Sequence, residues 1–287
     1  MRLGTRKRSA KAATKRASQS EQNRQPENLH ELLGKPLQLM SMFLRVGRKL
    51  GMQEHWLTIP ERENHAVLML SLGEPSESSK LVIAGVHGDE PAGVMGLLSF
   101  LFCMIESPAW RRQAGSFALV PMMSPSAFEL QTRTNLWNED ANRGYPVSGV
   151  PRVSTHQCVP SHEGRVLAHN LDALAPWVRK AVLALHEDCE QELFYLYAFH
   201  SKESAMPLAL RLRDVGFSHF GIVADSENFE GSVVRDGIIL NHVLHGALDE
   251  LIFKKLGVPV VVTETPGLKP LQSRVKATEQ ILKAFLL

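Results

Sequence analysis

His87 and Glu90 are the first residues along the chain whose types and spacing could do chemistry. They stand three positions apart in the segment Lys80–Glu90 (KLVIAGVHGDE). The apolar run Leu81–Val86, bounded by a charge and a glycine-containing turn, predicts a buried strand. The proline and the apolar residues that follow predict a helix over 92–105. An imidazole and a carboxylate on a strand-to-helix loop can bind one metal ion, and zinc accepts both ligand types.

Two further apolar runs end in residues of the same chemical kind. Residues 181–185 (AVLAL) precede His186, and residues 258–263 (VPVVVT) precede Glu264. Sheets in α/β proteins place their ligand sites beyond the carboxyl ends of the strands. A His-x-x-Glu pair is common by chance, so the agreement of three strand ends is what predicts a site.

Together, His87, Glu90 and His186 form a predicted zinc site of two histidines and one glutamate, with a fourth position open for water. Zinc would lower the pKa of that water from about 15.7 to about 7 and polarise a scissile carbonyl. A nearby carboxylate must take the proton of the water and pass it to the leaving nitrogen, and Glu264 is the candidate. The alternatives are a core histidine for His186 and a capping or surface acid for Glu264.

A polar segment, residues 129–145, lies between the first ligand pair and His186 and has little apolar periodicity. Such a segment in a compact domain is more often a functional loop than a linker. Arg143 can hold a substrate carboxylate with two parallel hydrogen bonds, and Asn142 can donate to the same group. Arg133 could stabilise the oxyanion that forms when the carbonyl becomes tetrahedral.

The order of these residues resembles the zinc carboxypeptidases of the carboxypeptidase A type. The resemblance spans residues 80–267 and includes the loop Arg-x-Asn-x-x-x-x-Asp-x-Asn-Arg and a Thr-Glu-Thr context around the last glutamate. It implies two histidines and a glutamate as zinc ligands, an arginine for the oxyanion, an Asn-Arg pair for the terminal carboxylate and a glutamate as general base. By this resemblance, the zinc ligands would be His87, Glu90 and His186, and Arg133 would stabilise the oxyanion. Asn142 and Arg143 would hold the terminal carboxylate, and Glu264 would be the general base.

The implied fold is α/β, a single domain with a mixed, mostly parallel sheet of about eight strands flanked by helices. The strand and helix predictions agree with an α/β fold, because apolar runs alternate with helical spacing. Further strands are predicted in four places and helices in five. The strands are 66–70, 116–123, 194–197 and 220–224, and the helices are 28–49, 163–179, 204–215, 240–256 and 271–285.

The reaction is left open between related alternatives. The leading hypothesis is a zinc carboxypeptidase that removes a C-terminal residue from a peptide. The phrase His-Gly-Asp-Glu-Pro also resembles the loop of aspartoacylase and succinylglutamate desuccinylase, which implies an N-acyl amino acid deacylase as the first alternative. An amidase acting on cell-wall peptides is the second, and a non-catalytic peptide-binding protein is the third. A clamp for a free carboxylate serves the peptidase and the deacylase equally, so these motifs do not separate them.

Some residues depart from the carboxypeptidase pattern. Glu187 and Asp188 directly follow His186 and are interpreted as supports for the ligands, as a site for a cationic substrate group, or as solvated acids. The substrate-capping tyrosine of that family has no clear counterpart here. Tyr145, Tyr195 and Tyr197 are the only tyrosines in the sequence.

Composition bounds the class of protein. Of the 287 residues, 44% are hydrophobic and 22% charged, as in ordinary globular proteins. Residues 1–24 hold eight basic residues and one acid, so the remainder has a formal charge of −5, which does not suggest a nucleic-acid partner. No apolar run reaches about 18 residues, which predicts no membrane span.

Three cysteines without a Cys-x-x-Cys pair suggest a reducing compartment, and hence the cytoplasm. We predict a disordered basic tail over 1–28 and one catalytic domain over 29–287; the oligomeric state stays open.

Overall fold

The structure is a computed structural model that describes most of the chain from residue 29 onward. The described residues are 29–60, 66–146, 157, 159–200, 206–229, 231–240 and 246–287. The basic tail predicted over 1–28 lies outside them.

A mixed sheet of ten strands forms the centre of the described part. Its spatial order is β1 (Gln53–Leu57), β2 (Val67–Leu72), β4 (Phe117–Val120), β3 (Lys80–Ile83), β5 (Ala181–Asp188), β10 (Val260–Pro266), β6 (Tyr195–Phe199), β9 (Ile238–Leu240), β8 (Ser232–Arg235) and β7 (Ser226–Phe229). The four strands β4, β3, β5 and β10 pair in parallel, and so do β6 and β9. The remaining five pairs among the described strands are antiparallel, so the parallel part is confined mainly to the middle of the sheet.

The expectation of about eight strands is wrong, because the strands near the sheet edges have weak sequence signals. β1 and β7 are mostly polar and half-exposed, so neither shows an apolar run. β9 has only three residues and ends at Leu240, the first residue of the helix predicted over 240–256. The strand predicted over 220–224 is also wrong: helix α8 extends to Phe220, and Ile222 makes only an isolated bridge to Phe194.

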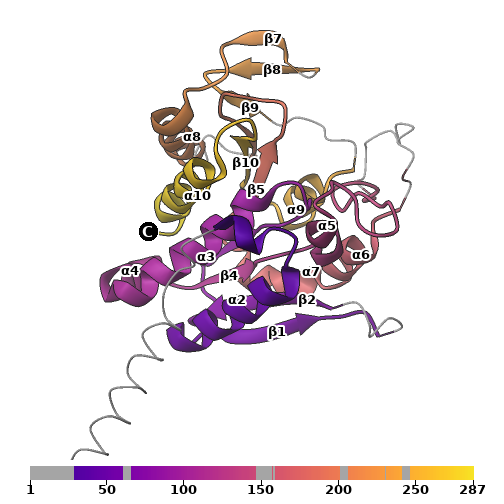
Figure 1. The fold of residues 1–287 in the computed structure, drawn as a ribbon, viewed down its shortest axis with the longest axis vertical. Coiled ribbons are helices and arrows are strands. Elements are labelled where there is room, and N and C mark those ends of the chain that lie inside the picture. The colour runs from indigo at the N-terminus through magenta and orange to yellow at the C-terminus, as the bar shows by residue number, and fades with distance from the viewer. Residues whose placement is uncertain are drawn as a thin grey trace, which may run out of the picture.

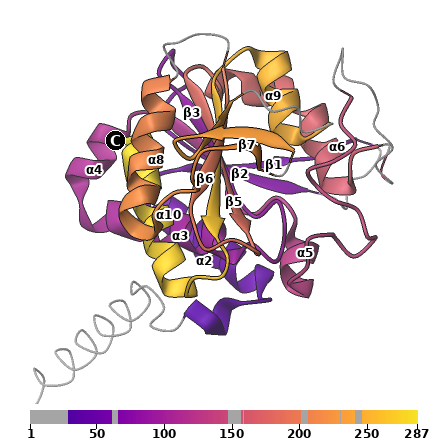
Figure 2. The same ribbon diagram turned by 90° about the horizontal axis from the view of Figure 1, so that it is seen from above.

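Helices cover both faces of the sheet (Figures 1 and 2). One face is covered by α2 (Pro36–Leu50), α3 (Pro91–Glu106), α8 (Met206–Phe220) and α10 (Leu271–Leu286), with α4 (Pro108–Ala114) beside α3. The other is covered by α6 (His162–His169), α7 (Leu171–Leu174) and α9 (Leu248–Leu256). The short elements η1 (Leu29–Leu32), α5 (Pro125–Leu130) and η2 (Ala175–Trp177) complete the set of described helices.

Alternate residues of the central strands supply the two cores. Leu183 and Val261 pack toward α3 and α10, whereas Val182 and Val262 pack toward α6 and α9. Side chains of a strand alternate between faces, and strands covered on both faces read as continuous apolar runs. This is why the 81–86, 181–185 and 258–263 runs predicted the middle of the sheet well.

The longest apolar helices agree with their predictions. α3 and α10 match the helices expected over 92–105 and 271–285 to within a residue. The two helices pack closely at Gly96 of α3. A Cβ on this residue would lie only 2.5 Å from the Thr278 side chain of α10. The helix expected over 163–179 is instead divided into α6, α7 and η2.

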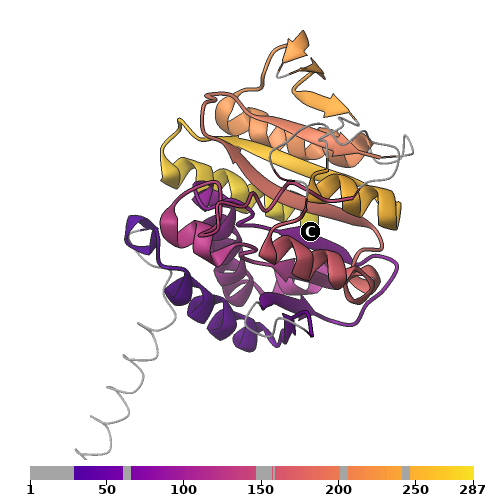
Figure 3. The same ribbon diagram turned by 90° about the vertical axis from the view of Figure 1, so that its right-hand side faces the viewer.

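The two edges of the sheet lie at opposite ends of the molecule. Figure 3 shows the orange hairpin of β7 and β8 at one end and the indigo elements that begin the described chain at the other. Among the described residues, no single helix is long and apolar enough to cross a membrane; α3 and α4 together pass that test but are bent by 115°.

Candidate metal centre and substrate pocket

The loop after β3 is held in a narrow space that only glycine allows. A Cβ at Gly88 would lie 1.8 Å from the carbonyl oxygen of Ala127, so any other residue would collide with backbone. The backbone N–H of Gly88 donates to the carbonyl of Thr132 at 2.8 Å. This contact fixes the loop, with His87 on one side of Gly88 and Glu90 at the entry to α3.

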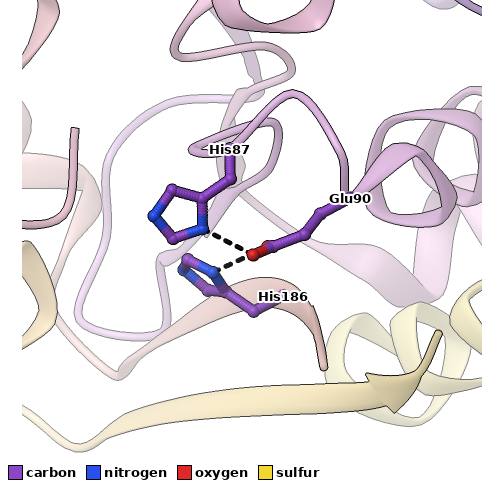
Figure 4. Close-up of side chains that lie close together, drawn as sticks. All are labelled: His87, Glu90 and His186. Carbon is purple, nitrogen blue, oxygen red and sulfur yellow. Dashed lines mark hydrogen bonds and ion pairs between the residues drawn. The ribbon is translucent and has the colours of Figure 1, made fainter. Parts of the chain in front are cut away.

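His87, Glu90 and His186 lie together at the carboxyl end of the parallel strands. Figure 4 shows both imidazoles directed at the carboxylate of Glu90. Nδ1 of His87 lies 2.5 Å from Oε1, and Nδ1 of His186 lies 2.9 Å from Oε2. All three side chains are buried, and one potential ligand atom from each lies within 4.8 Å of the others. The structure therefore brings together the three residues predicted as metal ligands.

The charges of the three groups are strongly linked. Burial opposes charge on His87, but the carboxylates of Glu90 and Asp140 outweigh it and raise the pKa of the imidazole to about 9. Burial likewise opposes charge on Glu90, and the two imidazoles outweigh it and hold the pKa of that carboxyl below its usual range. A buried carboxylate is thus kept ionised and favours positive charge next to it.

The donor set fits a divalent metal ion. Two imidazole nitrogens and one carboxylate are the ligand types of catalytic sites that leave a coordination position open. Nε2 of His186 is buried and makes no hydrogen bond to any described residue. A buried polar atom without a partner is unusual in a folded protein, and an ion or water at the site would explain it.

Asp140 is the supporting residue to which the sequence analysis gave no role. Its Oδ1 lies 3.1 Å from Nε2 of His87, and its Oδ2 accepts a hydrogen bond of 3.0 Å from Nε of Arg133. A carboxylate on the second nitrogen of a histidine fixes the ring orientation and leaves the other nitrogen for a metal. The signal was present in the quoted loop motif, but one-dimensional spacing does not show that Asp140 reaches His87.

Replacing Asp140 by asparagine is expected to weaken metal affinity by about 10- to 100-fold, because the carboxylate that orients His87 is lost. Competition with a chromogenic zinc chelator measures the affinity. Asp172→Asn, on α7 and away from the site, is the matched control. Equal zinc affinity in the Asp140 variant and the wild type would contradict the supporting role.

Glu264 lies in the row of side chains that includes His186. It is within β10 rather than beyond its end, and its Cα pairs with His186 of β5 on one side and Tyr195 of β6 on the other. Residues paired across adjacent strands have side chains on the same face. Burial raises the pKa of the Glu264 carboxyl well above its usual value, while His186 acts in the opposite direction. A cation at the site would lower that pKa again and favour the ionised base.

A pocket of about 560 Å³ opens over this row. It is lined by groups that could bind, polarise or protonate a substrate, and it contains all seven residues predicted from the sequence. Those lining residues include His87, Asp89, Glu90, Arg133, Asp140, Asn142, Arg143, His186, Tyr195, Tyr197, Val262 and Glu264.

The two predicted carboxylate binders differ in their surroundings. The Asn142 side chain is tied to the start of α9: its Oδ1 accepts from the backbone N–H of Leu248 at 2.8 Å, and its Nδ2 donates to Asp249 at 3.4 Å. Arg143 donates to the carbonyl of Asn142 at 3.0 Å and forms no ion pair with any described acid. Arg143 therefore has more capacity to bind an anion than Asn142, whose amide already has partners.

Glu187 and Asp188 are held by the fold. Glu187 is buried, accepts a hydrogen bond of 2.5 Å from the N–H of Ala92 in the first turn of α3, and pairs with Arg274 of α10. These contacts favour the supporting role among the three interpretations. Asp188 accepts hydrogen bonds from the Tyr195 hydroxyl at 2.8 Å and from the backbone N–H of Glu190 at 3.0 Å.

The polar loop is anchored to α6. Glu139 accepts hydrogen bonds from His162, including its backbone N–H at 2.9 Å, and from Asn135 at 3.0 Å. Asn135 also donates to the buried Glu163 at 2.9 Å. These contacts hold the segment that presents Arg133 and Asp140 to the candidate metal site.

Comparison with known proteins agrees with this geometry. Residues 77–222 match the succinylglutamate desuccinylase/aspartoacylase catalytic domain. A murein peptide amidase A of Vibrio campbellii is 33% identical over 119 residues, which cover 39% of this chain and 44% of that protein. The matched part thus spans less than half of this curated relative.

Solved structures share the fold over most of the chain. A candidate metallopeptidase of Shewanella amazonensis has a TM-score of 0.76 at 25% identity and covers 88% of this chain and 92% of its own. A metallo-carboxypeptidase of Burkholderia cenocepacia has a TM-score of 0.59 at 16% identity, covering 86% and 67%, which shows the fold alone.

The sheet and its flanking helices thus have the fold of the metallo-carboxypeptidases. The chain belongs to the succinylglutamate desuccinylase/aspartoacylase catalytic domain family. The predicted likeness to that branch is confirmed. The matched range includes every predicted site residue except Glu264, which lies beyond residue 222.

Proposed function

We propose that the protein is a zinc-dependent hydrolase of an amide bond whose leaving group is an amino acid with a free carboxylate. The observation that carries the proposal is the row of side chains near the carboxyl ends of the central strands. In it, His186 and Glu264 lie in register on adjacent strands, next to Glu90 and His87.

Zinc held by His87, Glu90 and His186 would supply a water of lowered pKa and a Lewis acid for the carbonyl. Glu264 would take a proton from water and deliver it to the leaving nitrogen. Arg133 would donate to the developing oxyanion, and Arg143 with Asn142 would hold the carboxylate of the leaving amino acid.

The reactions that remain differ in the acyl group. Removal of a C-terminal residue from a peptide is the leading hypothesis from the sequence, and the site is compatible with it. The family match favours an N-acyl amino acid substrate, and the murein peptide amidase relative favours a cell-wall peptide. A non-catalytic binding protein is disfavoured, because binding alone needs no base at the position of Glu264.

A mass-spectrometric screen tests the proposal. The zinc-loaded protein is incubated with the N-acetyl derivatives of the twenty standard amino acids, with short peptides and with murein peptides, and Glu264→Gln is the blank. Release of free amino acids from any of the three sets supports the proposal, and the set that reacts identifies the acyl group. No release from any set would contradict it.

Replacing Arg143 by alanine is expected to raise KM by roughly 10- to 100-fold, because a charge-assisted contact to the substrate carboxylate is lost. Steady-state kinetics on the best substrate of the screen measures the change. The same substrate with its carboxylate converted to carboxamide should bind both proteins equally weakly. Arg179→Ala, which removes an exposed arginine paired with Glu77, is the control. An Arg143 variant with unchanged KM for the acid would remove Arg143 from carboxylate binding.

A further inference from the structure

Tyr195 extends the row formed by His186 and Glu264. The register places these three residues side by side on β5, β10 and β6, with Glu264 in the middle. All three line the 560 Å³ pocket. Glu264 is therefore flanked by a predicted metal ligand on one side and by a phenol on the other.

The hydroxyl of Tyr195 donates its hydrogen bond in one defined direction. It donates to Oδ2 of Asp188 at 2.8 Å, while Oδ1 of Asp188 accepts the backbone N–H of Glu190. A tyrosine hydroxyl has one hydrogen to donate and lone pairs that accept. Since its hydrogen is directed to Asp188, the hydroxyl oxygen offers the pocket an acceptor.

The ring that carries this acceptor is held rigidly. Tyr195 is 2% exposed and makes edge-to-face contacts with Tyr197 at 5.6 Å and with Phe229 of β7 at 5.0 Å between ring centroids. Aromatic pairs in this geometry stabilise one ring position. A fixed acceptor can select a substrate group by its hydrogen-bonding type, because an unmatched polar contact is unfavourable.

The order of the row indicates which part of a substrate this acceptor faces. The acyl carbon must lie near His186, since the metal ligands are on that side of Glu264. The leaving nitrogen must lie near Glu264, which delivers its proton. Tyr195 lies on the opposite side of Glu264 from His186, so its hydroxyl faces the leaving nitrogen.

We propose that Tyr195, oriented by Asp188, is a substrate-binding residue whose hydroxyl oxygen accepts a hydrogen bond from the nitrogen of the scissile bond and of the released amine. This rests on the proposed function, because it assumes an amide substrate. The proposal goes beyond the proposed function because it predicts selection for amides over esters. Esters carry oxygen at the position of the scissile nitrogen and have no N–H to donate.

The test is Tyr195→Phe, which removes the acceptor and keeps the ring that packs on Phe229. The substrates are the best N-acyl amino acid or peptide of the screen and its ester analogue, in which oxygen replaces the scissile N–H. We expect kcat/KM for the amide to fall about tenfold, as for loss of one hydrogen bond, and kcat/KM for the ester to stay within about twofold. Tyr145→Phe is the matched control, because its buried hydroxyl donates to the carbonyl of Ala141, and Tyr145 does not line the pocket. It should leave the amide-to-ester ratio unchanged.

A binding measurement separates this proposal from the proposed function. The twenty standard amino acids are titrated calorimetrically into the zinc-loaded wild type, and the tightest binder is then titrated into Tyr195→Phe, with an expected loss of affinity of about tenfold. If the wild type turns over no substrate, the proposed function fails, and this titration alone decides the role of Tyr195. Equal loss of amide and ester turnover, unchanged amide turnover, unchanged affinity in the variant, or no binding of any amino acid by the wild type would each overturn the proposal.

Discussion

Replacing Glu264 by glutamine is expected to reduce kcat by about 10²- to 10⁴-fold while zinc remains bound, because the variant retains the shape of the side chain but cannot accept a proton. The carboxyl lies in register with His186, at the position from which a base could act on water beside the metal ligands. Glutamine should also be tolerated by the fold, since burial already disfavours the charged form of Glu264 in the metal-free protein.

Three quantities are measured: the single-turnover rate, the zinc content by inductively coupled plasma mass spectrometry, and the melting temperature. Glu54→Gln, which removes a carboxylate paired with the exposed Arg48, is the control and should leave all three unchanged. Turnover near the wild-type rate with a full complement of zinc would remove Glu264 from the mechanism. Loss of zinc together with activity would instead identify Glu264 as a fourth ligand.

Replacing His186 by alanine is expected to lower zinc affinity by more than about 100-fold, because a site with three protein ligands is reduced to two. Loss of an outer-shell partner already weakens metal affinity by about 10- to 100-fold, and loss of a ligand should have a larger effect. Activity should fall in parallel at limiting zinc.

The affinity is measured by chelator competition, with His219→Ala on the exposed side of α8 as the control. His186 is buried, so its removal could also loosen the fold; His186→Asn retains a polar side chain and serves as a second variant. Circular dichroism with and without zinc shows whether each variant is folded. A folded variant that retains the wild-type zinc affinity would place the third ligand elsewhere.

The sequence was most informative where strands are covered on both faces. The runs that precede His87, His186 and Glu264 are nearly continuous and apolar, so their positions in the sheet and the convergence of the three polar residues could be predicted. The edge strands β1 and β7 could not, because a polar, half-exposed strand stabilised by pairing with one neighbour has no distinctive pattern.

Within the site, the sequence predicted which residues lie together but not all of their partners. Asp140 stands in the same loop as Arg143, yet only the folded loop shows that it bonds to His87 and Arg133. Asn142 was predicted to hold a substrate, and the structure shows its amide already bonded to the start of α9. His87 and Leu248 are more than 50 residues away from their partners Asp140 and Asn142, and spacing along one segment does not report such contacts.

The sequence by itself determined the donor types, because imidazole and carboxylate are both ligands that zinc accepts, and the ends of the apolar strands place them together. The tertiary structure decided the order in space: His186, Glu264 and Tyr195 are neighbours only because β10 lies between β5 and β6. β5 and β6 are consecutive along the chain, and β10 comes from near its end, so this order depends on long-range pairing that local patterns do not report. It brings Tyr195, an unassigned tyrosine in the sequence, next to the proposed base.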